Sequence, residues 1–396
     1  MKYVFACLLF VSAFTTMGQY RQLSPQAEIS ILTVGPGKNL YDCFGHSAFR
    51  IVDPASGLDL AYNYGMFDTD APNFYLKFSM STAQYWLAAY RFDYFLQSYQ
   101  RQNRWITEQV LNLTLEEKQQ IFEKLEDNRR PENKFYRYDQ FYDNCATRMR
   151  DLVSDALGDN ITFSADHLDE STSLRDLVDE NTFNFPWWDF GIDVALGSPL
   201  DGAATPAEHM FLPDYVMQGF DNATIQRNGT TEPAVKEKIN LFETTFYEQS
   251  KETLSPVLIF ALVALVIILI TFLDFKRNKR SRWLDFSLML ITGLIGVVIL
   301  FLWFATYHST AAKNLNLLWA FFPNLYVAFL MLKKQPPAWV RSYARILFIL
   351  LLAMSFVWLL GLQVFSTAMI PIMVFLAARY VFLWQRALKN DESEAA

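Results

Sequence analysis

One segment of the chain, residues 141–151, combines residue types that could form a covalent intermediate. It reads FYDNCATRMRD and places Cys145 directly after Asp143 and Asn144. Asp and Asn are preferred N-cap residues, so we expect a helix to begin at the cysteine. Free N–H groups and the dipole at a helix N-terminus favour a thiolate and could stabilise an oxyanion beside it. Cys145 is therefore a candidate nucleophile; the alternative is a small buried residue, the common fate of free cysteine.

A thiol nucleophile needs a base, and the chain has four histidines. His46 lies in FGHSAF, at the expected start of a strand, where a neutral imidazole could project over a helix N-terminus. Asn63, in the neighbouring segment AYNYG, could accept from the ring N–H and fix the tautomer. Each could instead be an ordinary packed strand residue. His167 and His209 fit structural roles better.

Strands and helices with clear sequence signals would position these residues. Alternating apolar residues separated by Gly- and Pro-rich turns predict strands at Glu28–Val34, Phe44–Val52 and Leu58–Tyr64. A capping box at residues 114–117 precedes a helical repeat, and a second apolar helical face follows Cys145. The mixture predicts an α+β fold.

The apolar residues concentrate at the two ends of the 396-residue chain. Residues 1–18 have one Lys, an apolar centre and a small-residue end, which is typical of a cleaved secretory signal. From Ser255 onward, apolar runs of about the length needed to cross a bilayer predict five spans. They lie at about 255–273, 284–306, 315–332, 343–361 and 363–384. We therefore expect a signal peptide (1–18), an exported domain (19–254), a transmembrane domain (255–384) and a charged tail (385–396).

The distribution of basic residues predicts the orientation of these spans. The segments 276–282 and 333–345 and the tail are rich in Lys and Arg, which places them in the cytoplasm. The N-terminal domain, the loop containing His308 and the turn near Gly361 then lie outside it. The net charge of −7 and the lack of a basic patch argue against nucleic-acid binding.

A disulfide is an alternative fate for the cysteine. Removal of the signal, with Cys7, would leave Cys43 and Cys145 in a compartment that permits disulfides. Cys43 and His46 are three residues apart on an expected extended segment, so they would point to opposite faces. A catalytic pair and a Cys43–Cys145 disulfide are therefore roughly exclusive. The disulfide would favour a non-enzymatic sensor or assembly module.

Two further segments are candidates for contact with lipid. Residues 73–105 are dense in Phe, Tyr and Trp with scattered basic residues, which suits a soluble core or an interfacial groove for acyl chains. A polar cluster with His308, Asn314 and Asn316 precedes the third expected span. Polar residues at membrane depth are functional candidates, although a loop and a proline-kinked helix would also explain them.

Several motifs resemble known families. FGHSAFR upstream of NCATRMRD resembles permuted papain-like enzymes, in which His precedes Cys, such as NlpC/P60-related hydrolases and lecithin:retinol acyltransferase relatives. More closely, YDCFGHSAFRI, YNYGMF, RYDQFYDNCATRMRD and HSTAAKNLN followed by FP resemble the Lnb-type lipoprotein N-acyltransferases of diderm bacteria. Those proteins have an exported domain followed by five membrane helices. The resemblance covers essentially the whole mature chain.

The resemblance implies transfer of a fatty acyl chain from a phospholipid to the amine of a diacylglyceryl-cysteine lipoprotein. It implies Cys145 as nucleophile and His46 as base, with Ser47 and Asn144 flanking them in the same motifs. It also implies an inner-membrane location with a periplasmic N-terminal domain. Asn63 as orienting group is our own inference, and His308, Asn314 and Asn316 are possible substrate or membrane-interface residues.

No cofactor is needed for this chemistry, and the remaining histidines do not form a metal-ligand set. A competing enzymatic interpretation keeps the Cys–His pair but assigns hydrolysis, by a peptidoglycan amidase or endopeptidase or by a phospholipase. Five spans argue against a wall hydrolase, which could work with a single anchor.

Overall fold

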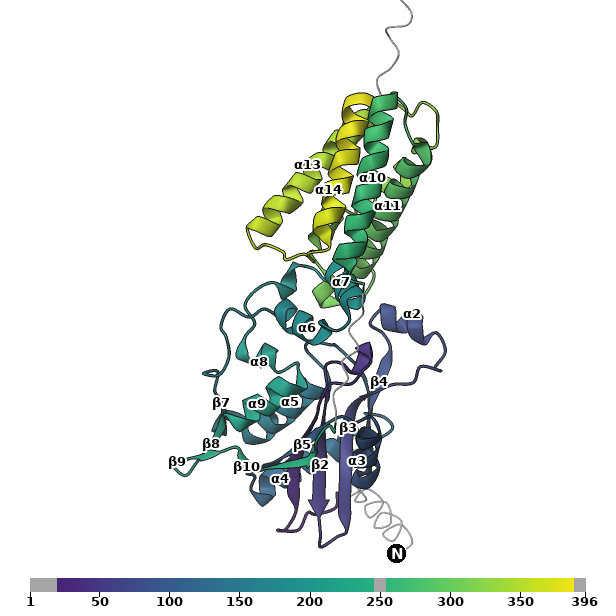
Figure 1. Cartoon of the computed structure of the whole chain (residues 1–396). Coiled ribbons are helices and arrows are strands. Elements are labelled where there is room, and N and C mark those ends of the chain that lie inside the picture. Colours follow the sequence, from purple (N-terminus) through teal and green to yellow (C-terminus); the bar gives the residue numbers. More distant parts are fainter. Residues whose placement is uncertain (1–19, 246–253, 388–396) are drawn as a thin grey trace, which may run out of the picture.

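The computed structural model describes residues 20–245 and 254–387. The expected signal peptide and all but the first residues of the expected tail lie outside these ranges. The described chain forms an N-terminal α+β part and a C-terminal bundle of helices that extends from one end of it (Figure 1).

An antiparallel sheet of seven strands forms the centre of the N-terminal part, in the order β10-β5-β1-β2-β3-β4-β6. The strands are β1 (Glu28–Val34), β2 (His46–Asp53), β3 (Leu58–Met66), β4 (Gln84–Arg91), β5 (Ile106–Leu111), β6 (Phe135–Arg137) and β10 (Val235–Phe242). The three predicted strands are confirmed as β1, β2 and β3. Strand β2 begins at His46 rather than Phe44, because Gly45 takes a left-handed conformation (φ 82°) immediately before it.

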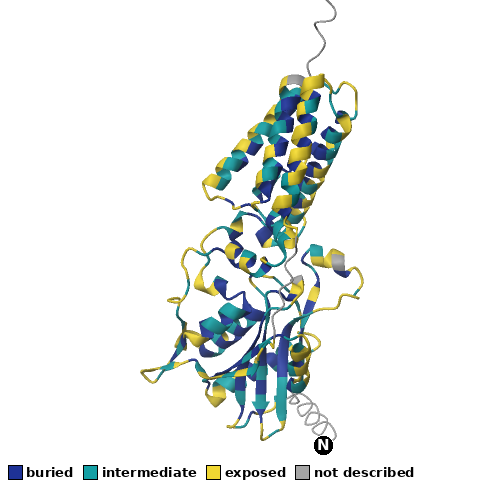
Figure 2. Ribbon diagram, viewed as in Figure 1, coloured by how far each residue is buried: buried dark blue, intermediate teal, exposed yellow. Residues whose placement is uncertain are grey.

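Helices cover both faces of this sheet. Helices α4 (Leu115–Asn128), α5 (Cys145–Leu157) and α9 (Pro213–Asp221) share a core with Ile29 and Ile31 of β1. The other face, with Leu32 and Val34, packs against α3 (Phe92–Arg101). Side chains two apart on a strand share a face, and both faces of β1 are buried here, as Figure 2 shows for the sheet.

Shorter elements complete the N-terminal part. They are η1 (Leu40–Asp42), α2 (Phe74–Ser79), η2 (Gly158–Asn160), α6 (Leu174–Thr182), α7 (Pro186–Ala195), η3 (Ser198–Leu200), α8 (Pro206–His209) and a small sheet of β7 (Ile161–Phe163), β8 (Ala223–Arg227) and β9 (Thr230–Pro233). Helices α6 and α7 lie between the large sheet and the C-terminal bundle, and α2 projects towards the same junction (Figure 1).

The C-terminal bundle contains α10 (Pro256–Arg277), α11 (Arg282–Phe304), η4 (Ser309–Ala311), η5 (Leu315–Leu318), α12 (Asn324–Met331), α13 (Trp339–Leu359), α14 (Met369–Phe382) and η6 (Leu383–Ala387). Three helices among the described residues, α10, α11 and α13, are long and apolar enough to cross a membrane, and the apolar helix Met369–Gln385 is shorter. Their outward faces carry many exposed residues (Figure 2), and among these are large apolar side chains such as Leu265, Val298 and Phe356.

The third predicted span is wrong as a continuous helix. Its first part forms the 3-10 turn η5, and α12 begins only after Pro323 and has eight residues. Proline lacks the N–H that a helix interior needs, so the helix cannot run through it. Eight residues rise about 12 Å, well short of a bilayer core of about 30 Å. The fifth predicted span likewise begins late, at Met369.

The loops of the bundle segregate to opposite ends. Arg280 Nη2 donates to the Lys333 carbonyl at 2.7 Å, which joins the two basic segments at the end remote from the sheet. At the other end, Gln363 Oε1 accepts from the Leu315 N–H at 2.8 Å, beside the N-terminal part. The basic loops therefore lie at one end of the bundle and the non-basic loops at the other, as the predicted alternation requires.

Candidate active site

Asn144 places Cys145 at the first position of α5. Its Oδ1 accepts from the N–H groups of Ala146 and Thr147 at 2.8 and 2.9 Å, as expected of an N-cap. Its Nδ2 donates to the carbonyls of Gln140 and Phe211 at 2.6 and 2.9 Å. Both polar atoms of the Asn144 side chain are thus hydrogen-bonded at the start of the helix, and no N–H of this side chain is left to stabilise an oxyanion.

His46 lies beside Cys145 and is oriented by Asn63. The two polar side chains belong to the neighbouring strands β2 and β3, and His46 Nε2 lies 3.0 Å from Asn63 Oδ1. A carbonyl oxygen can only accept, so the neutral imidazole carries its proton on Nε2 and leaves Nδ1 as the basic nitrogen. His46 also hydrogen-bonds Cys145. The structure thus brings the three predicted catalytic residues together.

The surroundings favour the charged forms of both partners. Burial raises the pKa of Cys145, but the charge and hydrogen bond of His46, a backbone hydrogen bond from Ser47 and the hydroxyl of Tyr138 outweigh it, so the pKa is lowered. Burial lowers the pKa of His46, whereas the charge and hydrogen bond of Cys145 and the bond to Asn63 raise it, and the net shift is upward. Both shifts favour the thiolate–imidazolium form of the pair.

Ser47 contributes through its backbone rather than its hydroxyl. The residue is fully buried, and its Oγ has no hydrogen-bond partner among the described residues. The backbone hydrogen bond from Ser47 to Cys145 is the contact that bears on the thiolate.

Tyr138 is a site residue that the sequence analysis missed. Its hydroxyl donates to Cys145 Sγ at 4.0 Å, and its ring stacks on Tyr85 with centroids 4.6 Å apart. Burial holds the pKa of Tyr138 well above its usual value, so it remains a donor. Gly65 gives the ring room, since a Cβ there would lie 3.0 Å from it. Tyr138 lies in an aromatic linker without periodicity, and nothing in the pattern singles it out.

The backbone amide of Cys145 is a further hydrogen-bond donor near Sγ. The N-cap occupies the next two N–H groups of α5, whereas the Cys145 N–H has no hydrogen-bond partner within the ranges that the structure describes. This amide and the Tyr138 hydroxyl are both next to Sγ, where the oxyanion of a tetrahedral intermediate would form.

An open cleft of about 1030 Å³ reaches the Cys145–His46 pair at His46. Its lining comes from η1 and the segment before it, from the ends of β2 and β3, and from the C-terminal end of α3. Phe67, at the end of β3, adds an apolar side chain to this lining and is 42% exposed.

Cys43 and Cys145 are both buried thiols that form no disulfide with each other, so the disulfide alternative is wrong for this structure. The premise about faces is also wrong, because Cys43 caps η1 and does not lie on strand β2. Burial and the nearby Asp42 raise the pKa of Cys43 to about 12, which makes it an unreactive thiol at neutral pH.

Asn314 and Asn316 lie at the junction of the two parts of the chain rather than beside Cys145 and His46. Asn314 Nδ2 donates to the carbonyls of Val194 and Ala195 at 2.9 and 3.0 Å, and Asn316 Nδ2 donates to the Asp193 carbonyl at 3.1 Å. Both side chains are buried and fasten the bundle to α7. His308 lies just before η4, and no described contact joins it to His46 or Cys145.

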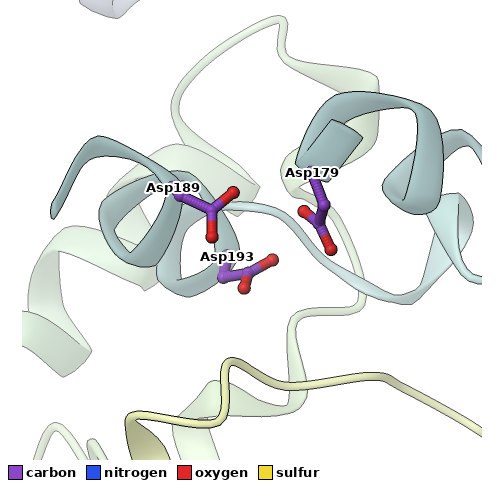
Figure 3. Close-up of side chains that lie close together, drawn as sticks. All are labelled: Asp179, Asp189 and Asp193. Carbon is purple, nitrogen blue, oxygen red and sulfur yellow. The ribbon is translucent and has the colours of Figure 1, made fainter. Parts of the chain in front are cut away.

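Three carboxylates gather at the same junction. Asp179 of α6 and Asp189 and Asp193 of α7 point towards one another (Figure 3), with one oxygen of each within 4.8 Å of the others. Burial and the neighbouring acids raise the pKa of Asp179 to about 8, so a proton on this group relieves the repulsion at neutral pH. Arg175 Nη1 donates to Asp193 at 2.7 Å and balances part of the remaining charge.

Comparison with known families identifies both parts of the chain. The family model of the Lnb N-terminal periplasmic domain matches residues 18–180, and that of the Lnb transmembrane domain matches residues 248–391. No curated protein and no solved structure matches the chain. The two matches cover most of the sequence in the order that the fold shows, and the chain belongs to the Lnb-type lipoprotein N-acyltransferase family.

Proposed function

We propose that this protein transfers a fatty acyl chain from a phospholipid to the N-terminal amine of a diacylglyceryl-cysteine lipoprotein through a thioester on Cys145. The observation that carries the proposal is the Cys145–His46–Asn63 array at the start of α5, with a hydrogen bond of 3.0 Å between His46 and Asn63. Membership of the family supports the choice of acyl transfer over other thiol chemistry.

The first half-reaction forms the thioester. The Cys145 thiolate attacks the ester carbonyl, a C–S bond forms, and the oxyanion is stabilised by the Cys145 N–H and the Tyr138 hydroxyl. Collapse of the intermediate breaks the ester C–O bond. The His46 imidazolium gives its proton to the leaving glycerol oxygen, and a lysophospholipid departs.

The second half-reaction forms the amide. The lipoprotein amine attacks the thioester, His46 now takes the proton from nitrogen, and the C–S bond breaks as the C–N bond forms. The products are an N-acylated lipoprotein and the thiolate–imidazolium pair with which the cycle began. Amines attack thioesters readily relative to water, so the exclusion of water from the site favours transfer.

The surface between the cleft and the bundle suits access by lipid. Leu76 and Phe78 of α2 are 58% and 45% exposed, and Phe67 continues this apolar surface into the cleft. The Tyr307 N–H, in the loop after α11, donates to the carbonyl of Met80 at the end of α2 at 3.2 Å. This contact holds α2 at the level where the membrane helices begin, so an acyl chain could pass from the bilayer to His46.

The same observations support a fold and location for the protein. Histidine on a strand, ahead of a cysteine at the start of a helix packed on that sheet, supports a permuted papain-like arrangement. The basic loops at the remote end of the bundle support an inner-membrane protein with a cytoplasmic C-terminus. The proposed division remains a signal at 1–18, a periplasmic domain at 19–254, a transmembrane domain at 255–384 and a tail at 385–396.

Mass spectrometry of lipoprotein N-termini tests the proposal. In a strain without another such enzyme, the Cys145→Ala variant should leave lipoproteins with a free amine, whereas the matched Cys43→Ala variant should acylate them normally. Unchanged N-acylation by Cys145→Ala would refute acyl transfer by this thiol. Release of free fatty acid without any N-acylated product would show that the same pair performs hydrolysis.

A further inference from the structure

The cleft beside His46 carries a buried cation that, among the residues the structure describes, makes no ion pair with a carboxylate. Arg104 lines this cleft and is 5% exposed. Its Nε donates to the Gly35 carbonyl at 2.7 Å and its Nη1 to Gln102 at 3.3 Å, whereas Nη2 is buried without a partner. Among the described residues no carboxylate forms an ion pair with it: both hydrogen bonds of the guanidinium go to neutral oxygens. Burying an unpaired charge is costly, which points to an anionic ligand.

Tyr99 holds this guanidinium next to the catalytic base. The ring of Tyr99 stacks on His46 with centroids 6.1 Å apart, and the guanidinium carbon of Arg104 lies 4.9 Å from the same Tyr99 centroid. Arg104 and His46 are therefore packed against one phenol ring. An anion bound by Arg104 would lie close to the reacting ester.

The remaining charges of the cleft also favour an anion. Lys38 and Arg101 line it as well, and Asp42 is the one carboxylate among the described residues of the lining. The charge of Asp42 acts on Arg104 without an ion-pair contact, because its carboxylate accepts from the backbone and side-chain N–H groups of Asn39 at 2.7 and 3.2 Å.

We propose that Arg104 binds the phosphate of the phosphoglyceride acyl donor and thereby positions its ester carbonyl at Cys145. The inference rests on the proposed function and adds the group that selects the donor. In a phosphoglyceride only the glycerol carbons separate the phosphate from the ester, and the planar fork of arginine matches phosphate oxygens. The diacylglyceryl group of a lipoprotein carries no phosphate, so Arg104 distinguishes the donor from the acceptor.

An N-acylation assay with two donors tests this role. The full chain in detergent micelles receives a diacylglyceryl-cysteine peptide and either phosphatidylglycerol or diacylglycerol with the same acyl chains. The native chain should prefer phosphatidylglycerol. Arg104→Gln should raise the KM for phosphatidylglycerol about tenfold or more and leave kcat/KM with diacylglycerol unchanged. Arg104→Lys should recover part of the loss, because it keeps the charge without the fork.

Two outcomes of this assay would overturn the proposal. The first is equal use of both donors by the native chain. The second is an equal loss with both donors in Arg104→Gln, which would assign Arg104 to the support of the site rather than to the phosphate. Arg91→Gln is the matched control, because Arg91 is an exposed arginine that precedes α3 and lies outside the cleft lining. This substitution should leave the kinetic constants with both donors unchanged.

A binding measurement separates this inference from the reaction itself. The Cys145→Ala chain should bind monomeric dihexanoyl-phosphatidylglycerol, and the added Arg104→Gln substitution should abolish this binding. Inorganic phosphate bound as tightly as the lipid would mean a free-phosphate site and would overturn the proposal. Lipid binding that depends on Arg104, without any N-acylated product from the native chain, would sustain the phosphate site and refute acyl transfer instead.

Discussion

Asn63 Oδ1 lies 3.0 Å from His46 Nε2, and this contact determines which imidazole nitrogen is free to act on Cys145. The register of the sheet makes the contact possible: β2 and β3 are adjacent antiparallel strands, His46 is the first residue of β2, and Asn63 follows Tyr62, the last β3 residue in register with β2. Asn63 is fully buried, so the acceptor is fixed in place. The pairing of two strands thus sets the tautomer of His46, the proposed base.

Loss of this acceptor should slow catalysis without unfolding the protein. Asn63→Ala leaves the His46 proton free to occupy either nitrogen, so we expect kcat for N-acylation to fall by about tenfold to a hundredfold. The measurement is the steady-state rate with saturating donor and acceptor, alongside the melting temperature. An unchanged kcat in a folded variant would show that Asn63 does not orient the base.

The reactivity of Cys145 should depend on pH through both partners. The pKa of Cys145 is lowered and that of His46 is raised, and both shifts favour the thiolate–imidazolium form of the pair. As pH rises, acylation of the enzyme should increase through the pKa of the thiol and decrease again as His46 loses its proton, since the leaving oxygen then lacks a donor.

Alkylation by iodoacetamide measures the thiolate directly. In a Cys43→Ala background, Cys145 should react at neutral pH, and His46→Gln should move its profile to higher pH. Cys43, whose pKa is raised to about 12, is the internal comparison in the native chain and should not react under these conditions. A profile for Cys145 that His46→Gln leaves in place would contradict the ion pair.

Removal of the Tyr138 hydroxyl should affect the reaction more than the fold. Tyr138→Phe keeps the ring that stacks on Tyr85 but removes the donor to Cys145 Sγ. We expect kcat to fall by about 100-fold, in the range for one oxyanion donor, with little change in KM. Tyr85→Phe is the matched control, since no hydrogen bond of its hydroxyl is described, and its rate should stay near the native one. Equal rates in the two variants would exclude Tyr138 as a donor.

Asn314 should contribute to the stability of the junction and not to the reactivity of the Cys145 thiol. Asn314→Ala removes two hydrogen bonds to the carbonyls of Val194 and Ala195, which lie in a buried interface. Unsatisfied buried groups of this kind cost about 1–3 kcal/mol, so the midpoint of thermal unfolding should fall. The alkylation rate of Cys145 should stay unchanged; a slower rate would connect the junction to the active site.

The residues with local signals were the ones that sequence could predict. An Asx cap followed by an apolar face predicts the start of α5 at Cys145, and alternation predicts β1 and β3. The meeting of Cys145, His46 and Asn63 was a further hypothesis about how these elements pack. Tyr138 and Arg104 lie in connections without periodicity, and their positions depend on tertiary packing against Tyr85 and Tyr99.

The membrane part shows a different limit of sequence patterns. Hydropathy measures apolar content and not helical continuity, so the third expected span did not reveal the break at Pro323. Asn314 and Asn316 were visible as unusual polar residues. Their function as the fastening to α7 needed the carbonyls of Asp193 and Val194, more than a hundred residues earlier in the chain.

The most direct test of the central claim is the mass of Cys145 during the reaction. The full chain is incubated with phosphatidylglycerol in the absence of acceptor, quenched with acid and digested for mass spectrometry. We expect an acyl adduct on Cys145 that hydroxylamine removes and that an added diacylglyceryl-cysteine peptide converts to N-acylated peptide. N-acylated peptide formed without an adduct on Cys145, or an adduct on another residue, would contradict the central claim.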